Sequence, residues 1–156
     1  MGPAGSGKTT VGELLAAKLS WNFFDGDHFH SRANIEKMSR GIPLTDEDRI
    51  PWLNSIREAM LQWETQRQNV VLTCSALKRG YRELLQISPT VKLVYLKGDY
   101  DLLRGRLRSR KGHYAGEQLL ASQFADLEEP TDALTIDASR SPEEIVDEVR
   151  KQLALV

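Results

Sequence analysis

The chain has 156 residues, of which 40% are hydrophobic and 28% charged, and its 21 basic side chains nearly balance 22 acidic ones. This length fits one compact domain of residues 1–156, and the balanced charge argues against a nucleic acid or an anionic membrane as a partner. No apolar run approaches the roughly 18 residues that cross a bilayer, and a glycine-rich motif stands where a signal peptide has its apolar core. Because Cys74 is the single cysteine, no internal disulfide can form, and we expect a reduced, cytoplasmic protein.

Short β-rich runs alternate with longer amphipathic patterns along the chain. Helices are predicted at Lys8–Leu19, Arg32–Ser39, Thr45 to about Gln66, and about Pro142–Leu153, the last two with capping signatures at Thr45/Asp48 and Ser141/Glu144. Strands are predicted at Asn22–Phe24, Val70–Thr73, Val91–Leu96 and Leu134–Ile136. This alternation predicts an α/β fold of three layers, with a parallel sheet flanked by helices.

The first residues carry the strongest motif of the sequence. Gly2-Pro3-Ala4-Gly5-Ser6-Gly7-Lys8-Thr9 satisfies the pattern G-x-x-x-x-G-K-[ST], in which backbone N–H groups of a tight loop and the start of a helix surround a phosphate. Lys8 is expected to reach the β- and γ-phosphates of ATP, and the Thr9 hydroxyl to bind Mg²⁺. Thr10 is expected to be a helix residue without a direct role.

The position of this motif is unusual, because such loops normally follow a buried strand and here only Met1 precedes it. We therefore expect the central strand of the sheet to be missing from the chain, and the natural protein to be longer.

A pair of carboxylates follows the first predicted strand. Asp25 and Asp27 stand at its carboxyl end, the edge at which doubly wound sheets bind ligands. Transfer of a phosphoryl group to a hydroxyl needs an oxygen ligand near Mg²⁺ and a carboxylate that accepts or orients the hydroxyl proton. Two aspartates two residues apart can divide these tasks.

Together with further motifs along the chain, this pair resembles the gluconokinase family, which belongs to the same P-loop kinase superfamily as shikimate kinases. The resemblance covers nearly the whole chain and is carried by Asp25-Gly26-Asp27-His28-Phe29-His30, Asn34-Ile35-Glu36-Lys37-Met38, Gly41-Ile42-Pro43-Leu44, Asp46-Glu47-Asp48-Arg49, Pro51-Trp52-Leu53, Cys74-Ser75-Ala76-Leu77-Lys78, Tyr81-Arg82, Tyr95-Leu96-Lys97-Gly98 and Arg110-Lys111-Gly112-His113. It implies a cytoplasmic homodimer that uses ATP to phosphorylate D-gluconate at its terminal hydroxyl, giving 6-phosphogluconate for the pentose phosphate pathway. By this likeness Asp25 is assigned to the metal and Asp27 to the acceptor and to catalysis. Ser31 departs from the family, which usually has proline there, but a serine can cap the following helix.

Gluconate offers one carboxylate and several hydroxyls, so its pocket requires a cation and neutral hydrogen-bond partners. The cationic candidates are Arg49, Lys78 and Arg82, and His30 is the candidate partner for a hydroxyl. Arg49 opposes the helix dipole in the first turn of its helix, which favours a ligand role. For Arg82 an ordinary helix salt bridge is an equal alternative.

The basic stretch near residue 110 lies between two helices and contains Gly112, which indicates a lid at about residues 106–118. Arg106 is assigned to ATP and Arg110 to catalysis, as cations that approach the transferring phosphoryl group. Arg140 lies in the loop 137–140, where the wider group contacts adenine, and is assigned to ATP by that analogy.

Other interpretations remain open. The chain can be a kinase of shikimate, adenylyl sulfate or a nucleoside monophosphate, or a module that binds ATP as a switch and transfers nothing. A nucleophile at Cys74 or Ser75 is disfavoured, because no histidine and carboxylate are patterned around them.

Overall fold

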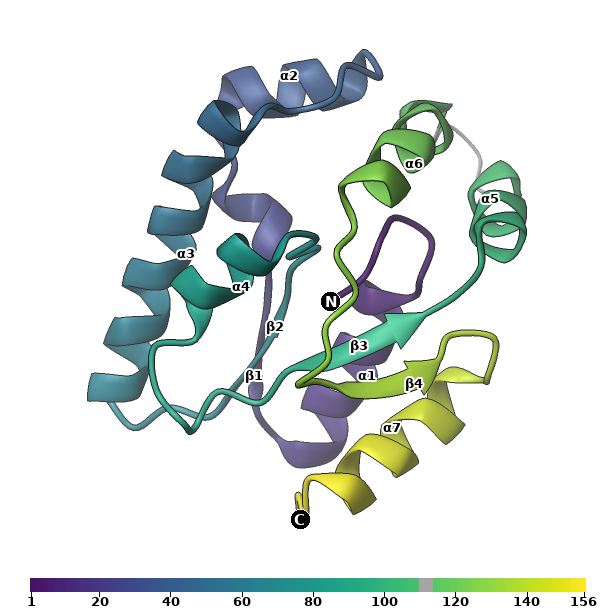
Figure 1. Ribbon diagram of the computed structural model, residues 1–156. Coiled ribbons are helices and arrows are strands. Elements are labelled where there is room, and N and C mark those ends of the chain that lie inside the picture. The colour runs from purple at the N-terminus through teal and green to yellow at the C-terminus, as the bar shows by residue number, and fades with distance from the viewer. Residues whose placement is uncertain (110–113) are drawn as a thin grey trace.

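A computed structural model of the protein describes residues 1–109 and 114–156, except for the side chains of 114–116. The elements run in the order α1 (Lys8–Leu19), β1 (Asn22–Asp25), the 3-10 helix η1 (Gly26–Phe29), α2 (Arg32–Ser39), α3 (Asp46–Thr65), β2 (Val70–Thr73), α4 (Arg79–Leu85), β3 (Val94–Lys97), α5 (Tyr100–Arg108), α6 (Tyr114–Asp126), β4 (Leu134–Asp137) and α7 (Pro142–Gln152). The parallel α/β architecture predicted from the sequence is confirmed (Figure 1).

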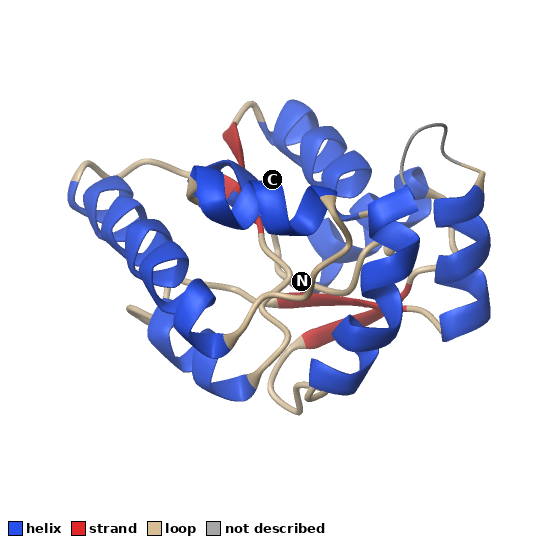
Figure 2. Ribbon diagram, turned by 90° about the horizontal axis from the view of Figure 1, so that it is seen from above, coloured by secondary structure: helices blue, strands red, loops and turns tan. Residues whose placement is uncertain are grey.

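The strands form two parallel pairs rather than one continuous sheet. Strand β1 pairs with β2 from Asn22↔Val70 to Asp25↔Thr73, and β3 pairs with β4 from Val94↔Leu134 to Lys97↔Asp137. In Figure 2, helices surround the two pairs.

Met1 and Gly2 link the two pairs. The amino group of Met1 donates to the Val94 carbonyl at 2.6 Å, and the Met1 carbonyl accepts from the Leu96 N–H at 3.0 Å. On the other side, the Gly2 N–H donates to the Ser75 carbonyl at 3.2 Å. These bonds anchor the beginning of the phosphate loop between strand β3 and the segment that follows β2.

Helices cover both sides of the β1–β2 pair, with α1 on one side and α3 and α4 on the other (Figure 1). One core joins α1 to α7 and to the β3–β4 pair, and consists of Val11, Leu15, Leu19, Leu96, Ile136, Ala138, Ile145, Val146 and Val149. A second core joins α3 and α4 around Trp52, Leu53, Ile56, Tyr81 and Leu85. A third, smaller cluster of Leu103, Leu107 and Leu120 joins α5 to α6.

Most predicted elements are confirmed with small differences at their ends. The capping box is present, since Thr45 accepts from the Asp48 N–H and the Asp48 carboxylate accepts from the Thr45 N–H. Ser31 caps α2 by accepting the Asn34 N–H at 3.1 Å. The predicted strand at Val91–Leu96 begins only at Val94, because the Val91 N–H closes a turn onto the Ser88 carbonyl. The predicted lid includes residues 110–113, which lie outside the described residues.

Candidate active site

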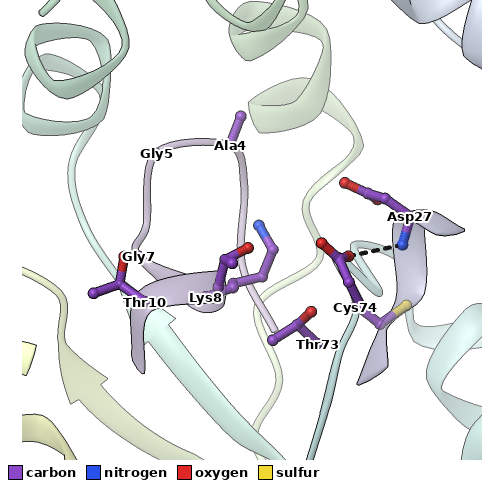
Figure 3. Close-up of a pocket in the computed structure, with 10 residues that line it drawn as sticks. Ala4, Gly5, Gly7, Lys8, Thr10, Asp27, Thr73 and Cys74 are labelled. Carbon is purple, nitrogen blue, oxygen red and sulfur yellow. Dashed lines mark hydrogen bonds between the residues drawn. The ribbon is translucent and has the colours of Figure 1, made fainter. Parts of the chain in front are cut away.

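The phosphate loop borders a cavity of about 460 Å³ (Figure 3). The lining residues come from the loop and α1, from the end of β1 and η1, and from the end of β2: Ala4, Gly5, Gly7, Lys8, Thr9, Thr10, Asp25, Asp27, Thr73 and Cys74. The loop turns into α1 at Gly7, whose φ of +94° is strained for any residue with a Cβ. The N-terminus of α1, with its partial positive charge, therefore lies beside the cavity.

The motif residues divide into those that face the cavity and those that support the loop. Pro3 and Ser6 are fully buried and do not line the cavity, and neither does Gly2. Thr10, to which the sequence gives no role, does line it. Lys8 folds back over the loop, where its Nζ donates to the carbonyls of Gly2 at 2.8 Å and Pro3 at 3.0 Å. The lysine charge is thus held above the loop, at the cavity.

The two aspartates line the same cavity, Asp25 from the last position of β1 and Asp27 from η1. Asp25 Oδ1 accepts the Asp27 N–H at 2.9 Å, which caps η1 and is the dashed bond in Figure 3. The turn packs tightly on β2, because a Cβ on Gly26 would lie 2.4 Å from the Thr73 carbonyl oxygen. Burial, and then the neighbouring Asp25 charge, raise the pKa of Asp27, while Lys8 acts in the opposite direction. A carboxylate with a raised pKa is a better proton acceptor.

Two residues at the end of β2 complete the wall of the cavity. Burial raises the pKa of Cys74 to about 11, so the thiol is a small wall residue and not a nucleophile, as the sequence predicts. Thr73 was missed by sequence reasoning. Its Oγ1 is buried and has no hydrogen-bond partner among the described residues. Its position as the last residue of a predicted strand was the available signal.

His30 lies next to the aspartates, packed between aromatic and polar neighbours. Its ring stacks on Trp52 with centroids 4.2 Å apart, and the Asn34 amide lies 3.2 Å from His30 Nδ1. Trp52 is itself fixed by a 2.7 Å hydrogen bond to the Gly26 carbonyl. Burial, and then the charge of Arg49, lower the pKa of His30 to about 4. The ring is therefore neutral at pH 7 and can serve as a neutral hydrogen-bond partner.

The cations Arg49 and Lys78 belong to one network of side chains from α3, α4 and α6. Arg49 donates to the Tyr81 hydroxyl at 3.0 Å and forms a 3.0 Å ion pair with Asp126. Lys78 pairs with Asp46 at 2.8 Å, and the Tyr81 hydroxyl also donates to Asp46. Sequence reasoning missed Tyr81 and Asp126 as partners, because the contacts join segments far apart along the chain.

The remaining predicted cations are spread more widely. Arg82 donates to the carbonyls of Ala76, Leu77 and Glu128 and so joins two loops, an arrangement that neither earlier interpretation of Arg82 included. Arg106 bridges the Gly5 carbonyl at 3.2 Å and the Ala138 carbonyl at 2.5 Å, so it connects the phosphate loop to the turn after β4. Arg140, in that turn, pairs with Glu144 and does not line the cavity. Arg110 lies outside the described residues.

The described residues contain no cluster of three or more His, Cys, Asp or Glu side chains that could hold a metal ion by themselves. Thr9 and Asp25 do line one cavity, and this sparse pair of oxygen donors fits Mg²⁺, which is usually held by one or two protein ligands, substrate phosphates and water.

A phosphate loop alone is compatible with switches and motors as well as with kinases. Here a carboxylate with a raised pKa shares the cavity with the loop and with a lysine, as transfer to a hydroxyl acceptor requires. The fold and the cavity together define a P-loop kinase.

Comparison with known proteins narrows this class. The shikimate kinase family model matches residues 4–154. Thermoresistant gluconokinase of Escherichia coli K12 is 43% identical, with 94% of this chain and 86% of that protein aligned. A gluconokinase structure from Sinorhizobium meliloti 1021 is 42% identical with a TM-score of 0.87, covering 99% of this chain and 89% of its own. An unliganded sugar kinase from Janibacter sp. HTCC2649 is 41% identical with a TM-score of 0.92, covering 100% of this chain and 92% of its own. The chain belongs to the gluconokinase family, within the wider group of shikimate kinase-like proteins.

No helix in the described part of the chain is both long and apolar enough to cross a membrane.

Proposed function

We propose that the protein transfers the γ-phosphoryl group of ATP to the terminal hydroxyl of D-gluconate, giving 6-phospho-D-gluconate. The observation that carries the proposal is the shared cavity, in which Asp27 faces the phosphate loop and Lys8. Membership of the gluconokinase family supports gluconate as the acceptor.

ATP, the phosphoryl donor, binds along the phosphate loop. The N–H groups of Gly5 and Gly7 donate to no partner among the described residues and lie at the cavity, where phosphate oxygens can accept from them. Lys8 neutralises charge on the β- and γ-phosphates by exchanging its bonds to loop carbonyls for bonds to phosphate. Thr9 and Asp25 would hold Mg²⁺, which when bound would neutralise part of the phosphate charge.

Asp27 acts on the acceptor. Its carboxylate accepts the proton of the terminal hydroxyl as the hydroxyl oxygen bonds to the γ-phosphorus and the bond to the β,γ-bridging oxygen breaks. Its raised pKa supports this role, because a more basic carboxylate takes a hydroxyl proton more readily. Gly26 fixes the reach of the carboxylate by packing the turn against β2.

The acceptor lies between His30 and the network of Arg49 and Lys78. Neutral His30 binds a hydroxyl, and Arg49 and Lys78 attract the carboxylate of gluconate. Arg82 supports this region by joining the loop after β2 to Glu128, and its direct contact with gluconate stays a prediction.

Several further roles stay predictions. These are a lid at residues 106–118, catalysis by Arg110, ATP contacts of Arg106 and Arg140, a homodimer, and a cytoplasmic location. Light scattering of the purified protein tests the homodimer directly.

A panel of acceptors tests the proposed function. ADP release is measured with Mg·ATP and D-gluconate, shikimate, adenylyl sulfate or a nucleoside monophosphate. We expect turnover with gluconate alone. Turnover with another member of the panel instead would replace gluconate as the acceptor, and ATP binding without turnover on any of them would favour a switch.

A further inference from the structure

The tip of the phosphate loop is held by a residue that the proposed reaction has not used. The Ala4 N–H donates to Gln123 Oε1 at 2.7 Å, although the two residues are 119 positions apart. Gln123 lies near the C-terminal end of α6. We propose that Gln123 is a positioning residue for the nucleotide, because it fixes the loop in the shape that receives the phosphates.

The neighbouring residues of the loop have their own hydrogen-bond arrangements, and the Ala4 N–H depends on Gln123. Gly2 donates to the Ser75 carbonyl, Pro3 has no N–H, and Ser6 donates to the Pro3 carbonyl at 3.3 Å. Ala4 is partly buried against Leu103, Leu107 and Leu120, so water has restricted access to this residue, and Gln123 supplies its N–H with a partner. The side chain of Gln123 thus completes the support of the loop.

The chemical type of the hydrogen-bond acceptor at position 123 matters as well. A glutamine oxygen satisfies the N–H without adding charge, whereas a carboxylate at this position would bring a negative charge beside the phosphates. The bond also directs the Ala4 N–H toward α6, while the N–H groups of Gly5 and Gly7 remain for the phosphates. The loop presents one defined set of donors, which lowers the entropic cost of binding.

The same end of α6 reaches the acceptor side of the site. Asp126 follows Gln123 by three positions, a spacing that places two side chains on neighbouring parts of one helix face. Asp126 pairs with Arg49, while Gln123 holds Ala4. The two contacts separate the effects of the two residues: Gln123 acts on the nucleotide and Asp126 on the acceptor side.

The test replaces Gln123 by methionine, which has a similar length but only a weak acceptor. Binding of a non-hydrolysable ATP analogue with Mg²⁺, and separately of D-gluconate, is measured by calorimetry. We expect Gln123→Met to weaken analogue binding by about five- to tenfold and to change gluconate binding by less than about twofold. In turnover assays the KM for ATP rises while kcat changes less.

Ser122→Ala is the matched control, because the Ser122 hydroxyl bonds to Leu119 of its own helix. This variant should leave both affinities within about twofold of the parent. Hydrogen exchange at the Ala4 amide gives a second measurement on the folded protein, and it should be faster in Gln123→Met than in the control.

Unchanged or tighter analogue binding in Gln123→Met overturns the inference, since tighter binding would mean that Gln123 competes with phosphate. If Gln123→Met weakens binding of the analogue and of gluconate equally and also lowers the melting temperature, the inference is overturned in favour of general destabilisation. The inference rests on the proposed use of the loop for ATP, and the parent protein tests that separately. If the parent does not bind the analogue, the proposed function fails as well, whereas normal binding by both proteins removes only the inference.

Discussion

Arg49 and Asp126 form an ion pair of 3.0 Å in which Arg49 is only 8% exposed. The cation assigned to the gluconate carboxylate is thus already paired, and it also bonds to the Tyr81 hydroxyl. A planar guanidinium has five N–H donors, so it can keep these partners and also donate to a substrate carboxylate. An ammonium group cannot reproduce that geometry.

Replacing Arg49 by lysine should therefore raise the KM for gluconate by about tenfold or more and leave the KM for ATP within about twofold. Steady-state assays with each substrate varied in turn measure both constants. Lys37→Arg is a control that keeps the positive charge at a cation paired with Asp48, and it should change neither constant substantially. A normal gluconate KM in Arg49→Lys would remove Arg49 from the acceptor site.

Asp27 should show opposite effects on activity and stability. Asp27→Asn removes the proton acceptor, so we expect kcat to fall by about 10²- to 10⁴-fold. Because the folded state raises the pKa of Asp27, its ionised form costs stability at neutral pH, and the variant should have a higher free energy of unfolding than the parent. Turnover assays and urea denaturation measure the two effects, with exposed Glu58→Gln as the control. Unchanged turnover in Asp27→Asn would contradict the proposed role.

Thr73 offers a test of the cavity wall. Its buried hydroxyl has no partner among the described residues, and valine has nearly the same shape without the hydroxyl. Thr73→Val should raise the free energy of unfolding of the ligand-free protein by about 1 kcal/mol, because an unsatisfied group is removed. If Mg·ATP then stabilises the variant less than the parent in thermal melts, the hydroxyl contacts the nucleotide or its metal. A lower stability of the ligand-free variant would show that the hydroxyl has a partner in solution.

His30 should make stability depend on pH. Its pKa falls from an ordinary 6.5 to about 4 in the folded protein, so the unfolded chain binds a proton first as the pH falls. Its contribution to stability is therefore complete above about pH 6.5 and is lost between 6.5 and 4. Urea denaturation across this range should show a steeper loss in the parent than in His30→Gln. Parallel profiles for the two proteins would contradict the lowered pKa.

Local patterns account for the parts of the fold that were predicted. The helix at Lys8–Leu19 has the predicted bounds because its apolar spacing and the phosphate loop lie within one stretch of sequence. The caps at Thr45 and Ser141 likewise depend on side chains three residues apart. The predicted start of β3 was wrong because the turn at Val91, not β propensity, decides where the strand begins. Helix α4 has only seven residues, too few for a clear period, and no bounds were predicted for it.

In the site, too, local patterns were predicted and contacts between distant residues were not. Lys8, Thr9, Asp25 and Asp27 were predicted as site residues, and the structure gathers them around one cavity. The pairing of Arg49 with Asp126, and of Ala4 with Gln123, joins residues from distant parts of the chain. Neither pair leaves a local signal, because a glutamine or aspartate near a helix end is an ordinary surface residue in sequence terms.

Identification of the product tests phosphoryl transfer to gluconate most directly. Purified protein is incubated with Mg·ATP and D-gluconate, and ³¹P NMR follows the transferred phosphate, with Asp27→Asn as the inactive control. We expect a phosphomonoester at the terminal carbon of gluconate, formed in equal amount to ADP and absent with the variant. Free phosphate as the sole product, or no gluconate phosphate from a protein that binds Mg·ATP, would contradict it.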